Sequence, residues 1–376
     1  MDFSYTEEQQ MLKDSISRFV QNDYDFFARA DIVASEQGYS KEHWQLFAEL
    51  GWLMTPFSEE DGGFGGSAVD LLVVMEELGK GIVIEPFLAT AVIGGGLIAE
   101  AGSPAQKEEL LGELMAGTLQ LAYAQNEPGS RYNLASVETR AEKTDDNYII
   151  NGHKAVVLNA PIADKFIVSV RTSGDRLEED GISLLLVDAN TAGVRLNSYK
   201  TVDGGRAAEV FFENVSVSAA SLLGEEGKAL PVMAAVQNRA ILAACAEAVG
   251  NMEVTYRKTV EYAQTRRQFG VSIGRFQALQ HRMVDMFMEH ETAKSILLMA
   301  AMKLDAGEDV EQAIAAAKSR ISRAARIVGQ EAVQIHGGIG VTEELDVGHY
   351  FKRLTTLELM FGNSSFHTRR FAELSA

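Results

Sequence analysis

The sequence predicts three domains, with helical domains on either side of a central β domain. Apolar residues recur at helical spacing up to about residue 117, alternate with a period of two over the next hundred residues, and then return to helical spacing. We therefore expect an all-α N-terminal domain over residues 1–117, a compact β domain over 118–225 and a helical C-terminal domain over 226–376. A chain of 376 residues exceeds the length at which single cores stop growing, which agrees with this division.

Helix signals and glycine-rich interruptions organise the first domain. Thr6 can cap a first helix and Gln9, three residues on, completes a capping box. Residues 56–66 contain Gly-Gly-Phe-Gly-Gly, which fits neither nucleotide-binding glycine pattern, so we interpret them as a tight surface loop. A second interruption is expected at Gly94–Gly96, where a widened pocket wall and close helix packing are both open explanations. The segment Gly102–Pro104 is expected to cap the next helix.

Strand patterns define the middle domain. The alternating apolar sets are Leu119, Leu121 and Tyr123, then Phe166, Val168 and Val170, then Ile182, Leu184 and Leu186, followed by the strand-forming stretch 210–217. The dipeptide Asn151-Gly152 follows Tyr148-Ile149-Ile150. It predicts a two-residue hairpin turn, because both of its positions favour positive φ.

A long apolar stripe defines the third domain. Apolar residues follow a 4/3 alternation from Phe276 to Leu304 for over seven turns, and Gly307 is expected to end this helix. His290 lies on the stripe, so we interpret it as a packed helix histidine. The lone Cys245 is interpreted as a small core residue. No group of histidine, cysteine and carboxylate residues has metal-ligand spacing, so no metal is expected.

Composition restricts the partners. Asp and Glu number 53 against 34 Lys and Arg, which gives a net charge of -19 and argues against nucleic acid or an anionic membrane surface as partner. A single cysteine excludes an internal disulfide framework and fits a reducing compartment. The sequence shows no secretory leader and no uncharged run of 18 apolar residues. We therefore expect no membrane span and a cytoplasmic protein of a bacterium.

Three motifs follow one another in the C-terminal domain. They are Arg266-Arg267-Gln268-Phe269-Gly270, then Phe276-Gln277-Ala278-Leu279-Gln280-His281, then Gln334-Ile335-His336-Gly337-Gly338-Ile339-Gly340. In this order and spacing they resemble the flavin-binding region of acyl-CoA dehydrogenases, and the helix–sheet–helix order resembles that family over essentially the whole chain. The resemblance implies the acyl-CoA dehydrogenase fold, with an all-α N-terminal domain, a central β-barrel-like domain and a C-terminal four-helix bundle. It also implies FAD as cofactor, and α,β-dehydrogenation of an acyl-CoA thioester in fatty acid or steroid side-chain β-oxidation.

The resemblance also assigns cofactor contacts. Arg266 would supply charge for the FAD pyrophosphate and Phe269 would lie against the cofactor. Gln334 and Gly338 would approach the pyrophosphate and adenosine of a neighbouring subunit's FAD, where glycine lets backbone N–H groups reach phosphate oxygens. The full set of expected cofactor-binding residues is Asn126, Arg266, Gln268, Phe269, Ile273, Phe276, Gln277, Gln334, Gly337, Gly338 and Asn363.

The part of the FAD site that a subunit's own β domain supplies in this family is altered here. The family has Thr-Glu-Pro followed by a small Gly-Ser-Asp segment. Here Asn126 can still hydrogen-bond a flavin edge, but Tyr132 falls where the small serine is expected. Further on, Val156 and Leu158 stand where the family has a tryptophan and a threonine whose hydroxyl serves the flavin N5. Leu158 has no polar atom, so we expect that hydrogen bond to be lost.

The catalytic base of the family is missing from its usual places. Removal of a weakly acidic thioester α-proton needs a carboxylate in a dry pocket. Most members carry it in a Tyr-Glu-Gly-Thr-like loop, where this chain has Phe361. Other members carry it on the first helix of the C-terminal domain, where no residue from 236 to 242 is Asp or Glu. Glu247 is a candidate for a displaced base, although a structural role is favoured, and Glu358 is similar. Oxyanion stabilisation through the main-chain N–H of residue 361 is still expected.

The elements offered to a neighbour's cofactor are thus kept, whereas those of the chain's own pocket are altered. This favours one subunit of a heterotetrameric dehydrogenase whose homologous partner bears the base. Phe361 and the Asn126 segment resemble the small subunit of pimeloyl-CoA dehydrogenases and the non-catalytic subunits of steroid-type enzymes. A homotetramer using Glu247, or a non-catalytic acyl-CoA-binding or assembly subunit, stays open. Electron-transfer flavoprotein is a further expected partner.

Overall fold

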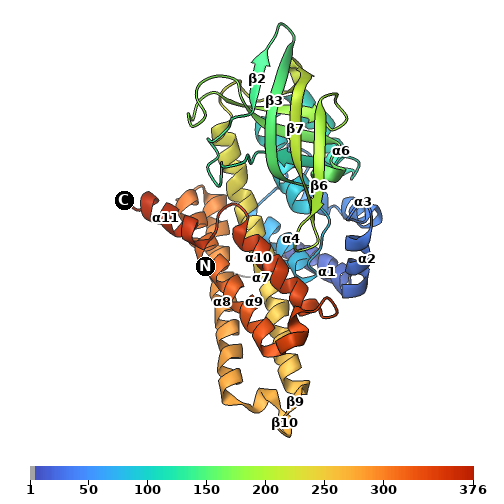
Figure 1. The fold of residues 1–376 in the computed structure, drawn as a ribbon, viewed down its shortest axis with the longest axis vertical. Coiled ribbons are helices and arrows are strands. Elements are labelled where there is room, and N and C mark those ends of the chain that lie inside the picture. Colours follow the sequence, from blue (N-terminus) through green and yellow to red (C-terminus); the bar gives the residue numbers. More distant parts are fainter. Residues whose placement is uncertain (1–4) are drawn as a thin grey trace. The chain divides into compact units, whose positions relative to one another are not determined.

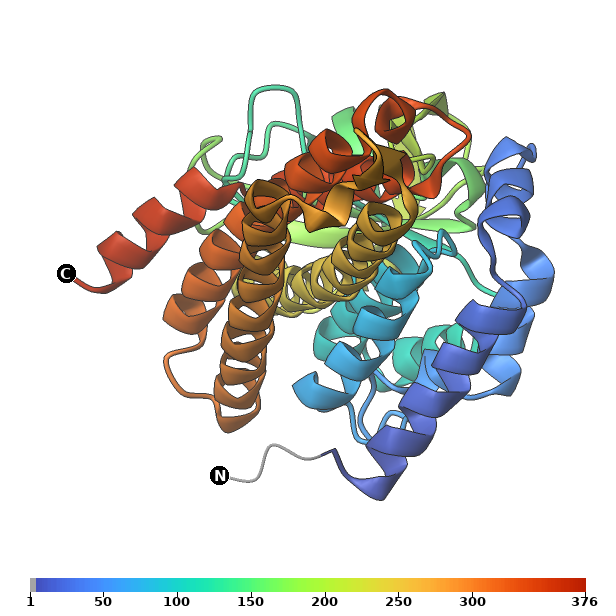
Figure 2. The same cartoon turned by 90° about the horizontal axis from the view of Figure 1, so that it is seen from below.

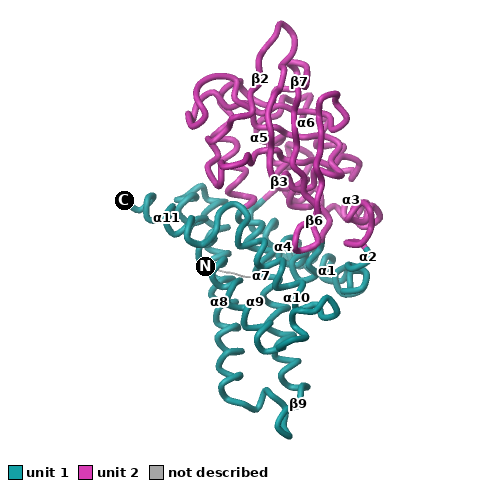
Figure 3. The backbone as a smooth tube through the Cα atoms, viewed as in Figure 1, with its two compact units in different colours: residues 1–31, 67–83, 241–376 teal, residues 32–66, 84–240 magenta. Residues whose placement is uncertain are grey.

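The computed structural model describes residues 5–376, which form two compact units (Figure 3). Residues 1–4 begin the stretch interpreted as a helix entry and lie outside the described residues. Of the described residues, unit 1 comprises 5–31, 67–83 and 241–376, and unit 2 comprises 32–66 and 84–240. The expected domain boundaries at 117 and 225 remain predictions.

Unit 1 is helical. Its elements are α1 (Glu7–Asn22), α4 (Ala68–Lys80), β9 (Arg267–Gln268), β10 (Val271–Ser272), η5 (Ile273–Arg275), α8 (Gln277–Ala306), α9 (Val310–His336), η6 (Gly337–Val341), α10 (Asp346–Leu359) and α11 (Ser364–Leu374). Two helices, α2 (Phe26–Ala34) and α7 (Leu230–Thr265), contain a boundary between the units. Figures 1 and 2 show α8 and α9 side by side as the long pair of the C-terminal bundle.

Local sequence signals explain the helix ends of unit 1. The Thr6 hydroxyl accepts the Gln9 N–H, and the Gln9 side chain accepts the Thr6 N–H, so the capping box at the start of α1 is confirmed. The predicted stripe forms α8, with His290 buried on it, and Gly307 ends the helix at φ 67°. Helix α7 passes a length-and-composition test for a membrane span, but 67% of its most apolar window is buried, as is usual for a core helix. Cys245 on this helix is also buried.

Two glycines allow α4 and α7 to cross at very short range within unit 1. A Cβ atom on Gly250 would lie 1.9 Å from the Glu76 carbonyl oxygen, and one on Gly79 would lie 2.3 Å from the Glu247 carbonyl oxygen. Both neighbours are backbone atoms of the opposite helix, which cannot rotate away. The crossing therefore depends on the absence of side chains at these two positions.

Unit 2 combines short helices with a sheet. Its helices are α3 (Lys41–Glu49), η1 (Trp52–Met54), η2 (Phe87–Gly95), α5 (Gly96–Ala101), α6 (Pro104–Met115), η3 (Ala160–Ile162) and η4 (Ala219–Ser221). The predicted cap at Gly102–Pro104 is confirmed, because the Ser103 hydroxyl accepts the Gln106 N–H at the start of α6. The structure adds that the Gln106 side chain accepts the Ser103 N–H, which completes a capping box.

The predicted interruption at Gly94–Gly96 is wrong. The π-helix η2 continues into α5 through these glycines. A Cβ on Gly94 would lie 2.6 Å from Leu121, and one on Gly95 would lie 2.4 Å from the Phe57 ring. Close packing rather than a widened pocket wall therefore explains the run.

The eight-stranded sheet of unit 2 carries its core. The strands are β1 (Leu121–Ala124), β2 (Arg140–Lys143), β3 (Asn147–Leu158), β4 (Lys165–Arg171), β5 (Ile182–Asp188), β6 (Val194–Lys200), β7 (Arg206–Ser218) and β8 (Leu222–Leu223). Their order is β6-β7-β3-β2-β4-β5-β8, and β1 pairs in parallel with β4. Inward-facing side chains such as Tyr148, Phe166 and Phe212 are almost fully buried against one another.

The predicted hairpin turn at Asn151-Gly152 is wrong. Both residues lie inside β3, and the turn that joins β2 to β3 closes earlier, where the Thr144 N–H donates to the Asn147 carbonyl at 2.8 Å. Gly152 sits instead at a register shift against β7, and a Cβ there would lie 2.4 Å from the Thr139 side chain. Close contact with a segment outside the dipeptide therefore explains the glycine.

Candidate functional site

The hairpin β9–β10 presents an aromatic side chain that residues 5–376 leave almost fully exposed. Phe269 occupies its turn at φ 52°, an unfavourable conformation for a bulky residue, and is 91% exposed. Its ring lies edge-to-face with that of Phe276, at a centroid distance of 6.1 Å. The preceding Arg266 is exposed, and its carbonyl accepts the Ile273 N–H at 2.8 Å, which closes the hairpin. Such a large exposed aromatic side chain is typical of a binding surface.

The end of α9 lies beside the end of α7. The Tyr262 ring stacks on His336 at 4.3 Å, and its hydroxyl donates to the His336 carbonyl at 3.3 Å. Since Tyr262 is four residues before Arg266 and His336 is directly before Gly337, the first and third motifs share one end of the bundle (Figure 1). Gln334, Gly337 and Gly338 are all exposed there.

Neither backbone conformation nor packing within residues 5–376 explains why position 338 is a glycine. Its φ is not in the left-handed region, and a Cβ there would meet nothing within 4 Å. Gly337, by contrast, ends α9 at φ 71°, which itself favours glycine. A glycine in open space fits a position that a group from outside the chain approaches closely, so the residues at this end of the bundle fit a bound dinucleotide.

The expected cofactor residues therefore form one surface in unit 1, with two exceptions. Gln268 and Gln277 are exposed on this surface and Ile273 is half-buried. Asn363 instead caps α11, where its side chain accepts the Phe366 N–H at 3.0 Å. Asn126 is exposed in unit 2, and its carbonyl accepts the Ala155 N–H at 2.8 Å.

A buried ion pair holds the Asn126 segment against the sheet. Lys154 Nζ on β3 lies 2.7 Å from Glu127 Oε1, and the Lys154 and Glu127 side chains are 0% and 2% exposed. Lys154 also donates to Ser169 Oγ at 3.0 Å and to the Gln125 carbonyl at 3.3 Å. The carboxylate of Glu127 accepts the N–H groups of the two residues that precede β2, at 2.6 and 2.9 Å. The whole connection from β1 to β2 is thereby fixed.

The pKa values of this pair follow from burial and mutual attraction. Burial lowers the pKa of Lys154 to about 8, against the opposing effect of Glu127. Burial alone would raise the pKa of Glu127, but the Lys154 charge and the backbone N–H groups outweigh it and lower the pKa. Both groups are therefore charged at neutral pH.

The flavin-facing positions of the β unit fit FAD less well. Val156 is 49% exposed at φ 52°, next to a bulge in β3, and Leu158 is half-buried. Neither side chain can donate a hydrogen bond. Tyr132, where a small serine was expected, is half-buried. The C-terminal surface thus fits FAD, whereas positions 156 and 158 of the β unit offer no side-chain donor.

The base position lies in a strained turn between α10 and α11. Phe361 has φ 58° and Gly362 has φ 109°. The Phe361 carbonyl accepts a hydrogen bond from His367 Nε2 at 2.9 Å. Lys318 of α9 donates to the carbonyls of Leu357 and Glu358 at the end of α10. Neither Phe361 nor its neighbour Gly362 brings a carboxylate to the turn.

Glu247 is held by Arg353 of α10. The guanidinium donates to both carboxylate oxygens, from Nε to Oε1 and from Nη2 to Oε2, the latter at 2.7 Å. Glu247 is 3% exposed. Because the Arg353 guanidinium engages both oxygens, neither is free to approach a ligand, which favours the structural role.

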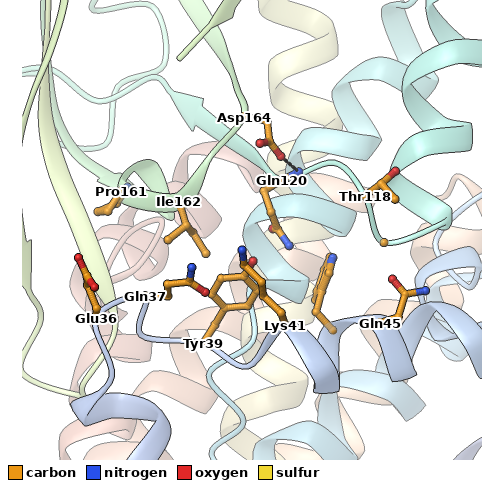
Figure 4. Close-up of a pocket in the computed structure, with 12 residues that line it drawn as sticks. Glu36, Gln37, Tyr39, Lys41, Gln45, Thr118, Gln120, Pro161, Ile162 and Asp164 are labelled. Atoms are coloured by element: carbon orange, nitrogen blue, oxygen red, sulfur yellow. Dashed lines mark hydrogen bonds between the residues drawn. The ribbon is translucent and has the colours of Figure 1, made fainter. Parts of the chain in front are cut away.

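Unit 2 also contains a polar cavity of about 690 Å³, lined by none of the expected cofactor residues. Its walls come from the segment before α3, α3 itself, the approach to β1 and the connection from β3 to β4 (Figure 4). Asp164 accepts the Gln120 N–H there at 2.7 Å. Among residues 5–376, no group of three His, Cys, Asp or Glu side chains could hold a metal ion.

Comparison with known proteins identifies the class. Three family models match: acyl-CoA dehydrogenase N-terminal domain over residues 6–118, middle domain over 122–215 and C-terminal domain over 230–375. A probable acyl-CoA dehydrogenase of Bacillus subtilis, YngJ, is 30% identical over 97% of both chains. The solved structure of PigA with FAD and proline has a TM-score of 0.92 at 28% identity, covering 99% of this chain and 98% of that one. The ChsE4-ChsE5 complex from Mycobacterium tuberculosis gives 0.89 at 26% identity, with the same coverage.

The fold and these relatives define an FAD-dependent oxidoreductase that acts on CH–CH groups. The chain belongs to the acyl-CoA dehydrogenase family. The predicted fold class and cofactor are thereby confirmed, while the roles of the individual site residues stay predictions. The sequence did not point to Lys318 or His367, because a single lysine and a single histidine within helices carry no distinctive pattern.

Proposed function

We propose that this chain is the base-lacking subunit of a heteromeric acyl-CoA dehydrogenase and completes the FAD site of a homologous partner. The observation that carries the proposal is a contrast. The turn that holds the family's glutamate presents Phe361, while Phe269 and Gly338 remain open at the surface for a cofactor held by another chain. A solved relative that is itself a complex of two chains, ChsE4-ChsE5, supports such an assembly.

In this proposal the residues of the chain bind and shield rather than transfer protons. When bound, FAD accepts the hydride that leaves the acyl β-carbon. Arg266 offsets the pyrophosphate charge, and Phe269 covers the cofactor from water. The α-proton goes to the partner's carboxylate, because Phe361, at the family's base position, has no carboxylate.

The proposal also names the setting of the reaction. The ligand is an acyl-CoA thioester, the electron acceptor is electron-transfer flavoprotein, and the compartment is the cytoplasm. Phe361 and the Asn126 segment support a place beside the small subunits of pimeloyl-CoA dehydrogenases and the non-catalytic subunits of steroid-type enzymes.

Counting FAD tests the assembly. Expressed alone, the chain should retain little flavin. Co-expressed with a homologous dehydrogenase that carries the catalytic glutamate, the purified complex should hold about one FAD per partner chain. Arg266→Ala should weaken FAD retention by the complex about tenfold, because a charge-assisted contact is lost. The matched variant Arg369→Ala, at an exposed arginine on α11, should leave FAD retention unchanged. Full flavin occupancy and acyl-CoA oxidation by the chain alone would contradict the proposal.

The alternative of a self-sufficient homotetramer requires Glu247 as base. Since Arg353 occupies both oxygens of that carboxylate, we expect Glu247→Gln to leave turnover of the co-expressed complex within about threefold of the wild type while lowering its melting temperature. Initial rates with an artificial electron acceptor and thermal melts of the same sample separate the two effects. Loss of turnover by about 10²-fold or more in a normally folded variant would favour the homotetramer.

A further inference from the structure

The polar cavity of unit 2 has two buried hydrogen-bond donors in its lining that the described chain leaves unpaired. Gln120 is 5% exposed and Trp44 is 2% exposed, and both residues line the cavity. The Nε2 atom of Gln120 and the Nε1 atom of Trp44 have no hydrogen-bond partner among residues 5–376. Because a buried N–H without an acceptor is unfavourable, two of them at one cavity indicate a molecule that brings acceptors to it.

The orientation of the Gln120 amide is set by its other contacts. Its Oε1 atom accepts hydrogen bonds from the Thr90 hydroxyl at 2.9 Å and from the Asn159 side-chain amide at 3.5 Å. An amide turned the other way would place its NH₂ group against these donors. Figure 4 shows the Gln120 side chain directed toward Tyr39 and Lys41. At this point the cavity wall therefore presents a donor and not an acceptor.

Contacts within unit 2 hold the walls of the cavity in place. Arg206 of β7 donates to the carbonyl of Ser35 at 2.7 Å and to that of Val33 at 3.3 Å, which fixes the segment before α3. The Gln120 N–H donates to the Asp164 carboxylate at 2.7 Å, and the Asp164 N–H donates to the Gln120 carbonyl at 2.9 Å. The cavity is therefore already formed before a ligand enters, as is usual for small-molecule sites.

The charges around the cavity restrict the class of ligand. Glu36 and Asp164 are acidic and Lys41 is basic, so acids outnumber bases in the lining of a chain whose net charge is -19. An anionic ligand would be repelled, and an apolar one would leave both donors unpaired. A neutral molecule rich in hydroxyl groups avoids both costs. Its oxygens can accept from Gln120 and Trp44, while its protons go to the carboxylates.

We propose that this cavity binds a neutral sugar, with hydroxyl oxygens on the Gln120 and Trp44 N–H groups and hydroxyl protons on Glu36 and Asp164. The volume of about 690 Å³ lies in the range of cavities that bind small molecules. The half-buried ring of Tyr39 adds an apolar surface for the C–H groups of the sugar. None of the expected cofactor residues lines the cavity, so this inference and the proposed function can fail independently.

The two tryptophans of the chain allow a direct test. With ¹⁵N in the indole groups, the purified full-length protein should show one Nε1–H resonance for Trp44 and one for Trp52, and Trp44→Phe assigns them. Titration with glucose, maltose and trehalose should shift the Trp44 resonance saturably for at least one sugar and leave that of Trp52 in place. Gluconate, which is anionic, and cyclohexanol, which is mainly apolar, should bind at least about tenfold more weakly.

Matched variants connect the binding to the two donors. Trp44→Phe removes the indole N–H but keeps an aromatic ring, and Gln120→Glu replaces the donor by an acceptor while keeping an oxygen for Thr90. Each should weaken binding of the best sugar by about tenfold in calorimetry. Trp52→Phe is the control, because it makes the same change at a buried tryptophan outside the cavity lining, and it should keep the affinity.

Three outcomes would overturn the inference. The absence of a saturable shift with all three sugars would mean that water alone occupies the cavity. Tighter binding of gluconate or cyclohexanol would assign the cavity to another class of ligand. Unchanged sugar affinity in Trp44→Phe would place the sugar elsewhere on the protein. Circular dichroism confirms that each variant is folded, and if Gln120→Glu does not fold, Trp44→Phe and its control still decide the result.

Discussion

Replacement of Lys154 by methionine is expected to lower the free energy of unfolding by about 3–5 kcal/mol, because the Glu127 carboxylate would then be buried without its cation. Methionine preserves most of the volume, so a cavity contributes little. Both tryptophans of the chain, Trp44 and Trp52, lie in unit 2 together with this pair. Urea unfolding followed by tryptophan fluorescence therefore reports on the unit that is affected.

Two further variants separate the ion pair from general damage to the sheet. The double variant Lys154→Met, Glu127→Gln should recover roughly half of the loss, because it removes the unpaired charge but keeps an acceptor for one backbone N–H. Lys165→Met on β4 removes a partly exposed partner of Asp188 and should cost no more than about 1 kcal/mol. Equal urea midpoints for Lys154→Met and Lys165→Met would show that the buried ion pair contributes no more to the free energy of unfolding than the exposed one.

Gly250→Ala is expected to destabilise unit 1 by about 3 kcal/mol, because the added Cβ would overlap the Glu76 carbonyl and force α4 and α7 apart. Unit 1 is mainly helical, so a thermal melt followed by circular dichroism should show a lower midpoint. Gly112→Ala in α6 is the control with the opposite sign. A Cβ there meets nothing within 4 Å, so helix propensity alone should stabilise by about 0.5–1 kcal/mol. A Gly250→Ala protein that melts with the wild type would refute the close crossing.

The sequence correctly predicted those features that depend on residues close to one another along the chain. The Thr6 and Ser103 caps, the stripe of α8 and its end at Gly307 all follow from spacing within a few turns, and the structure confirms them. Predictions at Asn151-Gly152 and Gly94–Gly96 failed for a shared reason. In both places a side chain from another segment packs so closely that a Cβ would clash with it. The side chain is that of Thr139 at Gly152, and those of Leu121 and Phe57 at Gly94 and Gly95.

The candidate site shows the same division. The order of the three C-terminal motifs indicated the exposed surface around Phe269 and Gly338, since each motif is local. The residues that fix the rest are recognisable only through partners far along the chain. Lys154 lies 27 residues from Glu127, and Lys318 lies 39 residues from the carbonyl of Leu357 that it caps. Spacing could not reveal these contacts, because they arise when strands and helices pack.

Cys245 gives the protein a practical property. It is the single cysteine of the chain, it is buried, and burial raises the pKa of its thiol to about 11, so the reactive thiolate is scarce and unreachable. Maleimide dyes should therefore not label Cys245 in the folded protein. A cysteine introduced at the exposed Asp145, between β2 and β3, would carry one fluorophore per molecule. Energy transfer to a labelled companion could then count the subunits of the assembly in solution.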